Sequence, residues 1–81
     1  MNEHDLDPLA GLPDDHPRRL LVDAALRNLG GATIAEVSLA AVAGEAGLGR
    51  STLYRAFPGG RDELLRAALA AEVARFWRGL A

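Results

Sequence analysis

The segment between Leu39 and Phe57 constrains the fold more than any other part of this 81-residue chain. Two short helices that cross steeply through a turn need a small residue at the crossing, a turn residue that tolerates positive φ, and an apolar residue after it. Ala43, Gly47 and Leu48 provide these three features in this order. The segment therefore predicts a helix-turn-helix, which sets the fold class as all-α.

The second helix of this motif, expected over residues 50–57, has two different sides. Its inner side is apolar and consists of Leu53, Ala56 and Phe57. Its outer side is polar, contains no acidic residue, and consists of Arg50, Ser51, Thr52 and Arg55. The alternative is a small helical bundle in which the alanines and glycines serve only packing. The whole pattern, with a helix before it and a Pro-Gly break after it, favours the helix-turn-helix.

Capping residues and apolar stripes predict the helices that come earlier in the chain. Pro17 suits a helix start, because its missing N–H would have no partner there. Apolar residues at helical spacing support a helix over residues 18–29, and Gly30 ends it. Ser38 is a natural N-cap for a helix over residues 39–46, because its hydroxyl can accept a free backbone N–H.

A fourth helix is expected to begin near Asp62 and Glu63, because acidic residues suit the positive end of a helix. It follows the chain break at Pro58. Its broad apolar face consists of Leu64, Leu65, Ala68, Leu69, Val73, Phe76, Trp77 and Leu80. The predicted architecture is a three-helix helix-turn-helix domain over residues 18–61. The start of a fourth helix follows over residues 62–81.

Residues 1–17 differ in composition from the rest of the chain. They hold five acidic residues and no basic one, a net charge of −5, and their prolines and glycine interrupt any period. We expect a disordered acidic leader that would repel DNA, with His4 and His16 solvated. Residues 18–81 hold nine arginines against six acidic residues, a net charge of +3. The part expected to fold is therefore mildly basic.

Composition excludes several other classes of protein. There is no cysteine, no apolar run of about 18 residues that could span a membrane, and no secretory signal pattern. The expected compartment is the cytoplasm, with no membrane partner. No Ser/His/Asp, Cys/His or metal-ligand set stands in the part expected to fold, so we expect no enzyme, no cofactor and no metal site.

Two stretches of the chain together resemble a known family. Asp23 to Leu26 read D-A-A-L, and Ala46 to Phe57 read A-G-L-G-R-S-T-L-Y-R-A-F. With conservative matches between them at Ser38, Val42 and Ala43, the spacing is ungapped. From Leu21 to Leu65 the chain resembles the N-terminal DNA-binding domain of the tetracycline-repressor (TetR) family of transcription regulators.

The resemblance implies a role for each matching residue. The 50–57 helix would be the recognition helix, inserted into the major groove of double-stranded DNA, with Gly49 at the position of the family's serine. Arg50, Ser51 and Thr52 would lie near base edges and adjacent phosphates. Ser38, Tyr54 and Arg61 would hold phosphates, and Arg55 would contact a base or a phosphate. Plainer roles stay open: Tyr54 as partly core, Arg55 as a solvated charge and Ser38 as a cap only.

The chain also departs from the family's pattern. Gly49 replaces the usual serine, Asn28 stands where an apolar residue is common, and the turn before Arg61 is one residue longer. Family members normally carry a larger C-terminal helical domain that binds an effector and forms a homodimer. The resemblance therefore implies a homodimer in a full-length form and weak self-association in this chain. The chain would then be either a truncated piece or a protein that works without sensing an effector.

Two functions are therefore expected, and the first is favoured over the second. The first is sequence-specific binding of double-stranded DNA by a transcription regulator, a repressor. The second is a protein-interaction module on the same scaffold, in which Phe76, Trp77 and Leu80 bind a partner helix. The acid-free outer side of the 50–57 helix favours the first function.

Overall fold

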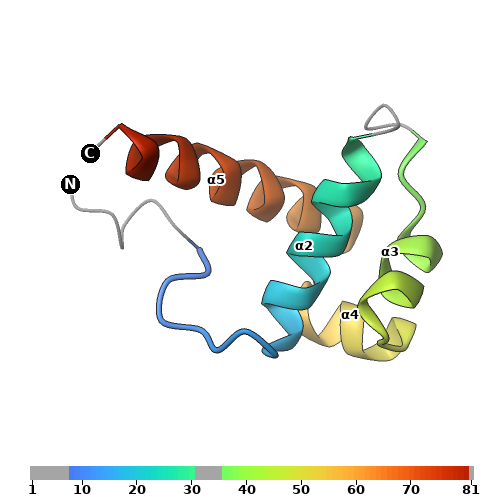
Figure 1. Cartoon of the computed structure of the whole chain (residues 1–81). Helices are drawn as coiled ribbons and strands as arrows, with labels where there is room; N and C mark the ends of the chain where they lie inside the picture. Colours follow the sequence, from blue (N-terminus) through green and yellow to red (C-terminus); the bar gives the residue numbers. More distant parts are fainter. Residues whose placement is uncertain (1–7, 31–35, 81) are drawn as a thin grey trace.

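The computed structural model describes residues 8–30 and 36–80, and within these ranges all regular structure is helical. Four helices follow one another: α2 (Pro17–Leu29), α3 (Leu39–Ala46), α4 (Arg50–Ala56) and α5 (Arg61–Gly79). Helix α2 lies at the centre, with α3 and α4 on one side and the long α5 on the other (Figure 1). The predicted all-α fold is confirmed.

Residues that the sequence singled out cap α3 and form the turn of the helix-turn-helix. Ser38 caps α3, its hydroxyl accepting the N–H of Ala41 at 3.3 Å. Gly47 ends α3 in the left-handed region, with φ 72° and ψ 27°. The N–H of Leu48 then donates to the carbonyl of Ala43 at 2.9 Å, which turns the chain toward α4. Helix α4 ends at Ala56, one residue before the expected end.

Replacing Gly47 by valine is expected to lower the free energy of unfolding by about 1–2 kcal/mol or more, because a β-branched side chain fits a positive φ poorly. Thermal melts measure the change. Gly44→Ala is the matched control, because Gly44 lies inside α3 and a Cβ there meets nothing within 4 Å. The control should raise stability by about 0.5–1 kcal/mol. Equal melting temperatures for both variants and the parent would contradict this role of the turn.

The core sits where the four helices meet. Its largest fully buried side chains come from all four helices and from Phe57, the C-cap of α4: Leu21, Val22, Val42, Leu53, Phe57 and Leu64. Leu26, Leu29, Leu39, Ala46, Leu48 and Ala56 pack against this cluster while partly exposed. The expected inner sides of the first three helices are therefore the buried ones.

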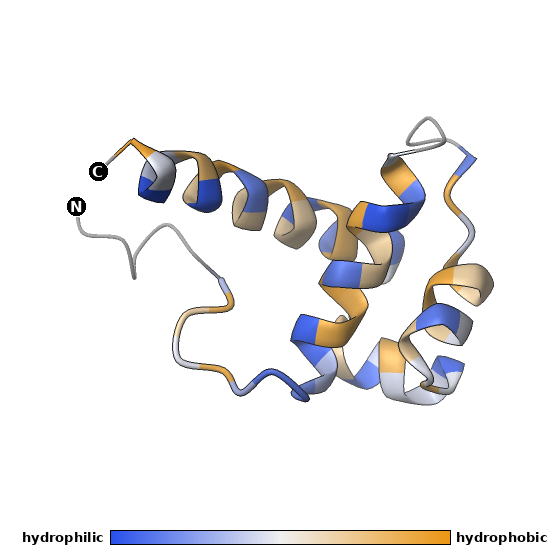
Figure 2. Ribbon diagram, viewed as in Figure 1, coloured by the Kyte–Doolittle hydropathy of each residue, from blue (hydrophilic) through white to orange (hydrophobic). Residues whose placement is uncertain are grey.

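Helix α5 is buried mainly over its first half, where Leu64, Leu65, Ala67 and Ala68 belong to the core; in its second half Ala74 is also buried. The large apolar side chains beyond Ala68 are about half exposed or more: Leu69, Val73, Phe76, Trp77 and Leu80. Figure 2 shows apolar residues continuing along α5 to its end, beyond the other helices. None of the helices in the described ranges is long and apolar enough to cross a membrane.

The expectation of a disordered leader does not hold for residues 8–16. Leu9 is only 4% exposed and belongs to the core cluster. The Arg19 guanidinium donates from Nη2 to the carbonyl oxygens of Leu9 at 2.9 Å and Leu12 at 3.1 Å, which holds this segment against α2. Residues 1–7, including His4, lie outside the described residues.

The other histidine has a structural role instead of the expected solvated one. His16 is half-buried and precedes Pro17, the first residue of α2. Its Nδ1 atom accepts the backbone N–H of Arg18 at 3.1 Å, so His16 is the N-cap of α2. The start of α2 at Pro17 follows the prediction.

Candidate nucleic-acid interface

The outer side of α4 is the surface that the structure leaves open on the helix-turn-helix. Leu53 is fully buried, whereas Arg50, Ser51 and Arg55 are exposed. Neither Arg50 nor Arg55 forms an ion pair within residues 8–30 and 36–80. Helix α4 therefore presents two guanidinium groups and a hydroxyl to solvent, without an acidic residue among them.

Tyr54 lies on the same helix and is positioned by the turn before α5. Its side chain is 44% exposed, so it is neither a core residue nor fully solvated. Gly60 adopts φ 70°, and a Cβ placed on it would lie 3.3 Å from the Tyr54 Cε1 atom. The ring thus rests against the backbone of Gly60, with its hydroxyl available to a partner outside the domain.

Thr52 stands at the border between α4 and the start of α2. It is half-buried, and with Arg55 and Ala56 it lines one wall of a hollow of about 420 Å³. The opposite wall is formed by residues 16–18. Thr52 therefore lies at the rim of the outer side, and Arg55 belongs to both the outer side and the hollow.

Ser38, Gly49 and Arg61 lie at the ends of helices. Ser38 is exposed at the start of α3, and its hydroxyl proton is free to donate, since the cap uses the oxygen as an acceptor. Gly49 is the exposed N-cap of α4 and offers no side-chain cap. Arg61 opens α5 and is half-buried.

Two acidic residues of the neighbouring helices α3 and α5 are held by other groups. Glu45 of α3 accepts from Arg27 of α2, with 3.2 Å between Oε2 and Nε. Glu63 of α5 turns back to accept the N–H of Gly59 at 2.6 Å, which closes the turn that follows α4. Both carboxylates thus serve the fold.

One residue near this surface was missed by sequence reasoning. Arg18, on the first turn of α2, donates from Nη1 to the carbonyl oxygen of Ala56 at the end of α4. Its Cζ atom lies 4.3 Å from the centre of the Phe57 ring. A signal was present, since two arginines open α2, where the positive helix end disfavours cations.

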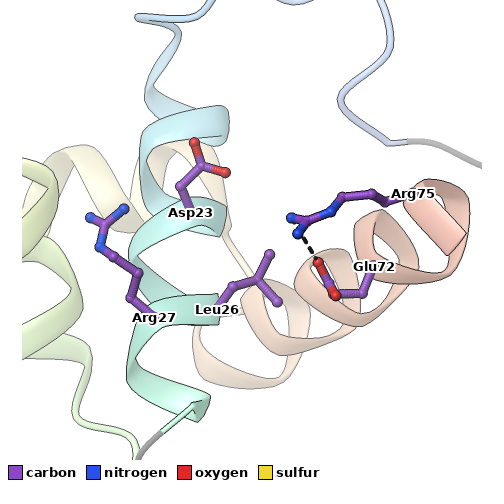
Figure 3. A pocket seen from close by; sticks show the side chains of 5 residues that line it. All are labelled: Asp23, Leu26, Arg27, Glu72 and Arg75. Atoms are coloured by element: carbon purple, nitrogen blue, oxygen red, sulfur yellow. Dashed lines mark ion pairs between the residues drawn. The ribbon is translucent and has the colours of Figure 1, made fainter. Parts of the chain in front are cut away.

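A second hollow, of about 400 Å³, separates α2 from α5 (Figure 3). Its charged side chains are two acids and two arginines: Asp23, Glu72, Arg27 and Arg75. Arg75 pairs with Glu72 at 3.2 Å, and Arg27 is committed to Glu45. The hollow therefore carries no excess of either sign that would select an ionic ligand.

Comparison with known proteins bears on the same part of the chain. The family model described as "Bacterial regulatory proteins, tetR family" matches residues 21–68, which include α3 and α4 and the start of α5. No curated protein and no solved structure shows a significant similarity to the chain. The match spans more than half of the 81 residues. The chain therefore belongs to the TetR family of regulatory proteins, and the matched residues form its N-terminal DNA-binding domain.

Proposed function

We propose that this domain binds double-stranded DNA sequence-specifically, with α4 in the major groove, and that it serves a transcriptional repressor. The observation that carries the proposal is the outer side of α4, where Arg50, Ser51 and Arg55 are exposed without an acidic neighbour on the helix. The major groove admits an α-helix, and arginine pairs well with guanine edges and phosphates. Such a regulator works where the bacterial chromosome lies, in the cytoplasm.

Each candidate residue has a distinct role in this proposal. Base edges are contacted from the first turn of α4 by Arg50, Ser51 and Thr52, with Gly49 allowing close approach of the backbone. Phosphates are held by Ser38, Tyr54 and Arg61, and Arg55 contacts a base or a phosphate. Phosphate contacts fix the position of the helix on the duplex, and base contacts carry the sequence preference.

Salt dependence of duplex binding tests the proposal. A preferred site is first selected from a random duplex pool, and its binding is then compared with that of a scrambled duplex over a range of salt concentrations. We expect tighter binding to the selected site and a fall in affinity of about 0.9 log units per log unit of salt for each phosphate held. Binding that is insensitive to both sequence and salt would contradict the function.

Tyr54→Phe removes only the hydroxyl that we place on a phosphate. Because phosphates carry no sequence information, affinity for the selected and the scrambled duplex should fall by the same factor. A hydrogen bond to a charged acceptor such as phosphate contributes about 1.5–3 kcal/mol, which corresponds to a loss of roughly 13- to 160-fold. Mobility-shift titrations with both duplexes measure this, and a loss confined to the selected site would assign Tyr54 to a base instead.

The exposed end of α5 supports a second candidate function, the binding of a protein partner. Phe76 and Trp77 are 62% and 55% exposed, and their ring centres lie 6.0 Å apart in an edge-to-face pair. Each ring can bury roughly 150–250 Å² in a contact. A cluster of exposed apolar residues of this kind marks an interaction surface. We propose a homodimer in a full-length form of the protein and weak self-association of this chain through the cluster.

Sedimentation of the 81-residue chain is expected to show reversible, concentration-dependent association. The double variant Phe76→Ser/Trp77→Ser should stay monomeric at the same concentrations, because it removes the two largest exposed side chains of α5. A single copy should bind DNA weakly. Two copies that occupy half-sites spaced by one helical turn should bind more tightly. A parent that stays strictly monomeric at high concentration would contradict this surface.

A further inference from the structure

We propose that Arg18 is a positioning residue that sets the orientation of the recognition helix α4 on DNA. The inference rests on the proposed function and adds a residue that itself stays off the DNA. Helix α4 has seven residues, too few to be stable alone. Its orientation therefore depends on what holds its two ends.

The first end of α4 is fixed by the turn of the helix-turn-helix. The N–H of Leu48 donates to the Ala43 carbonyl, and the Leu48 side chain packs against the core. In the middle, Leu53 is fully buried. These contacts fix the depth of α4 and the place where it begins, and the fully buried ring of Phe57, its C-cap, anchors the far end in the core. The carbonyl of Ala56 and the exposed face of the last turn are not held by these core contacts.

The last turn of α4 is also held by Arg18, which is 38 positions away from Ala56 in the chain. Arg18 gives one N–H to the Ala56 carbonyl and lies 4.3 Å above the Phe57 ring. A cation is favourable at this end of a helix because the last carbonyls carry partial negative charge. The planar guanidinium suits both contacts at once, since it donates within its plane and stacks with its face.

This bridge crosses the hollow of about 420 Å³ between the start of α2 and α4, where packing between the two helices is incomplete. The hollow is lined on the α4 side by Thr52 and Arg55, two of the residues proposed to contact DNA. Without Arg18, no other side chain in the described ranges hydrogen-bonds from α2 to α4. Loss of the bridge should let the end of α4 shift and move these residues relative to the bases.

The test compares Arg18→Ala with Arg66→Ala, which removes the same charge from an exposed position on α5. Affinity for the selected duplex should fall at least about 5-fold in Arg18→Ala, and affinity for a scrambled duplex less than about 2-fold. Arg66→Ala should change both by the same small factor. The slope of log affinity against log salt should match that of the parent for Arg18→Ala, because Arg18 holds no phosphate. A salt dependence shallower than that of the parent by about 0.9 would show that Arg18 holds a phosphate and would overturn the proposal.

Amide hydrogen exchange without DNA tests the bridge itself. In Arg18→Ala, exchange should quicken in the last turn of α4 and at Phe57, while the buried part of α2 keeps its protection. If that variant fails to fold, Arg18→Lys takes its place, because lysine keeps the charge and one donor but loses the planar stack. Lysine should give an intermediate loss of sequence preference. Unchanged exchange and unchanged preference would overturn the role of Arg18. A parent protein with no sequence preference would contradict the proposed function and, with it, the role of Arg18 in recognition. The exchange experiment would still show whether Arg18 holds the end of α4.

Discussion

Phe57→Ala is expected to leave this chain largely unfolded at room temperature. Phe57 is the largest fully buried side chain of the core, and truncation of a buried phenylalanine costs about 3–5 kcal/mol. A single core in a chain of this size rarely supplies more than about 3–5 kcal/mol of stability in total. The substitution therefore removes nearly all of it, and helical circular dichroism at 25 °C should show the loss.

The other phenylalanine of the chain is the matched control. Phe76 is 62% exposed, so Phe76→Ala should change the free energy of unfolding by no more than about 1 kcal/mol. Phe57→Leu keeps most of the buried volume and should lose less stability than the alanine variant. A Phe57→Ala protein that melts like the Phe76→Ala protein would show that the core does not depend on this ring.

The ends of the helices were predictable because each depends on a local rule. Pro17 stands at the start of α2, and Ser38 caps α3 through a bond that spans three positions. Gly47 takes a positive φ that other residues rarely adopt. Such features need no knowledge of the tertiary fold. The inner sides of the helices followed from helical spacing for the same reason.

Sequence reasoning missed two kinds of contact. One joins distant parts of the chain, and the other involves apolar residues that follow no helical spacing. Leu9 lies in a stretch that Pro8, Gly11 and Pro13 interrupt, so no helical spacing predicted its place in the core. Arg18 and Arg19 each donate to backbone carbonyls outside α2. Their position at the positive end of a helix was the available signal, because a cation there needs compensation elsewhere.

The candidate DNA-contacting residues stand between these two cases. The sequence pattern predicted that Arg50, Ser51, Thr52 and Arg55 lie on the outer side of α4; the structure exposes Arg50, Ser51 and Arg55 but half-buries Thr52. It could not predict that Thr52 lies at the rim of a hollow or that Gly60 supports the Tyr54 ring. Both depend on how the starts of α2 and α5 approach α4. Their contacts with DNA stay a prediction.

Arg50→Ala is expected to weaken binding to the selected duplex by about 1–3 kcal/mol, which is roughly 5- to 150-fold, if Arg50 contacts a guanine. Arg50 is the first residue of α4, and no acidic residue stands in that turn to balance its charge. A cation at the positive end of a helix is unfavourable in the free protein. An acceptor outside the chain, such as the O6 and N7 atoms of guanine, would compensate for it.

The pattern of loss distinguishes a base contact from a phosphate contact. A base contact predicts a loss for the selected duplex with a much smaller change for the scrambled one, and relaxed preference at one base pair when each position of the site is varied. A phosphate contact predicts equal losses on both duplexes and a salt slope lower by about 0.9. Arg66→Ala is the charge-matched control, since it removes the same charge from an exposed position on α5. If Arg50→Ala and Tyr54→Phe both bind the two duplexes as the parent does, then the outer side of α4 is not the DNA-binding surface. The exposed end of α5 would then be the more important functional surface of the domain.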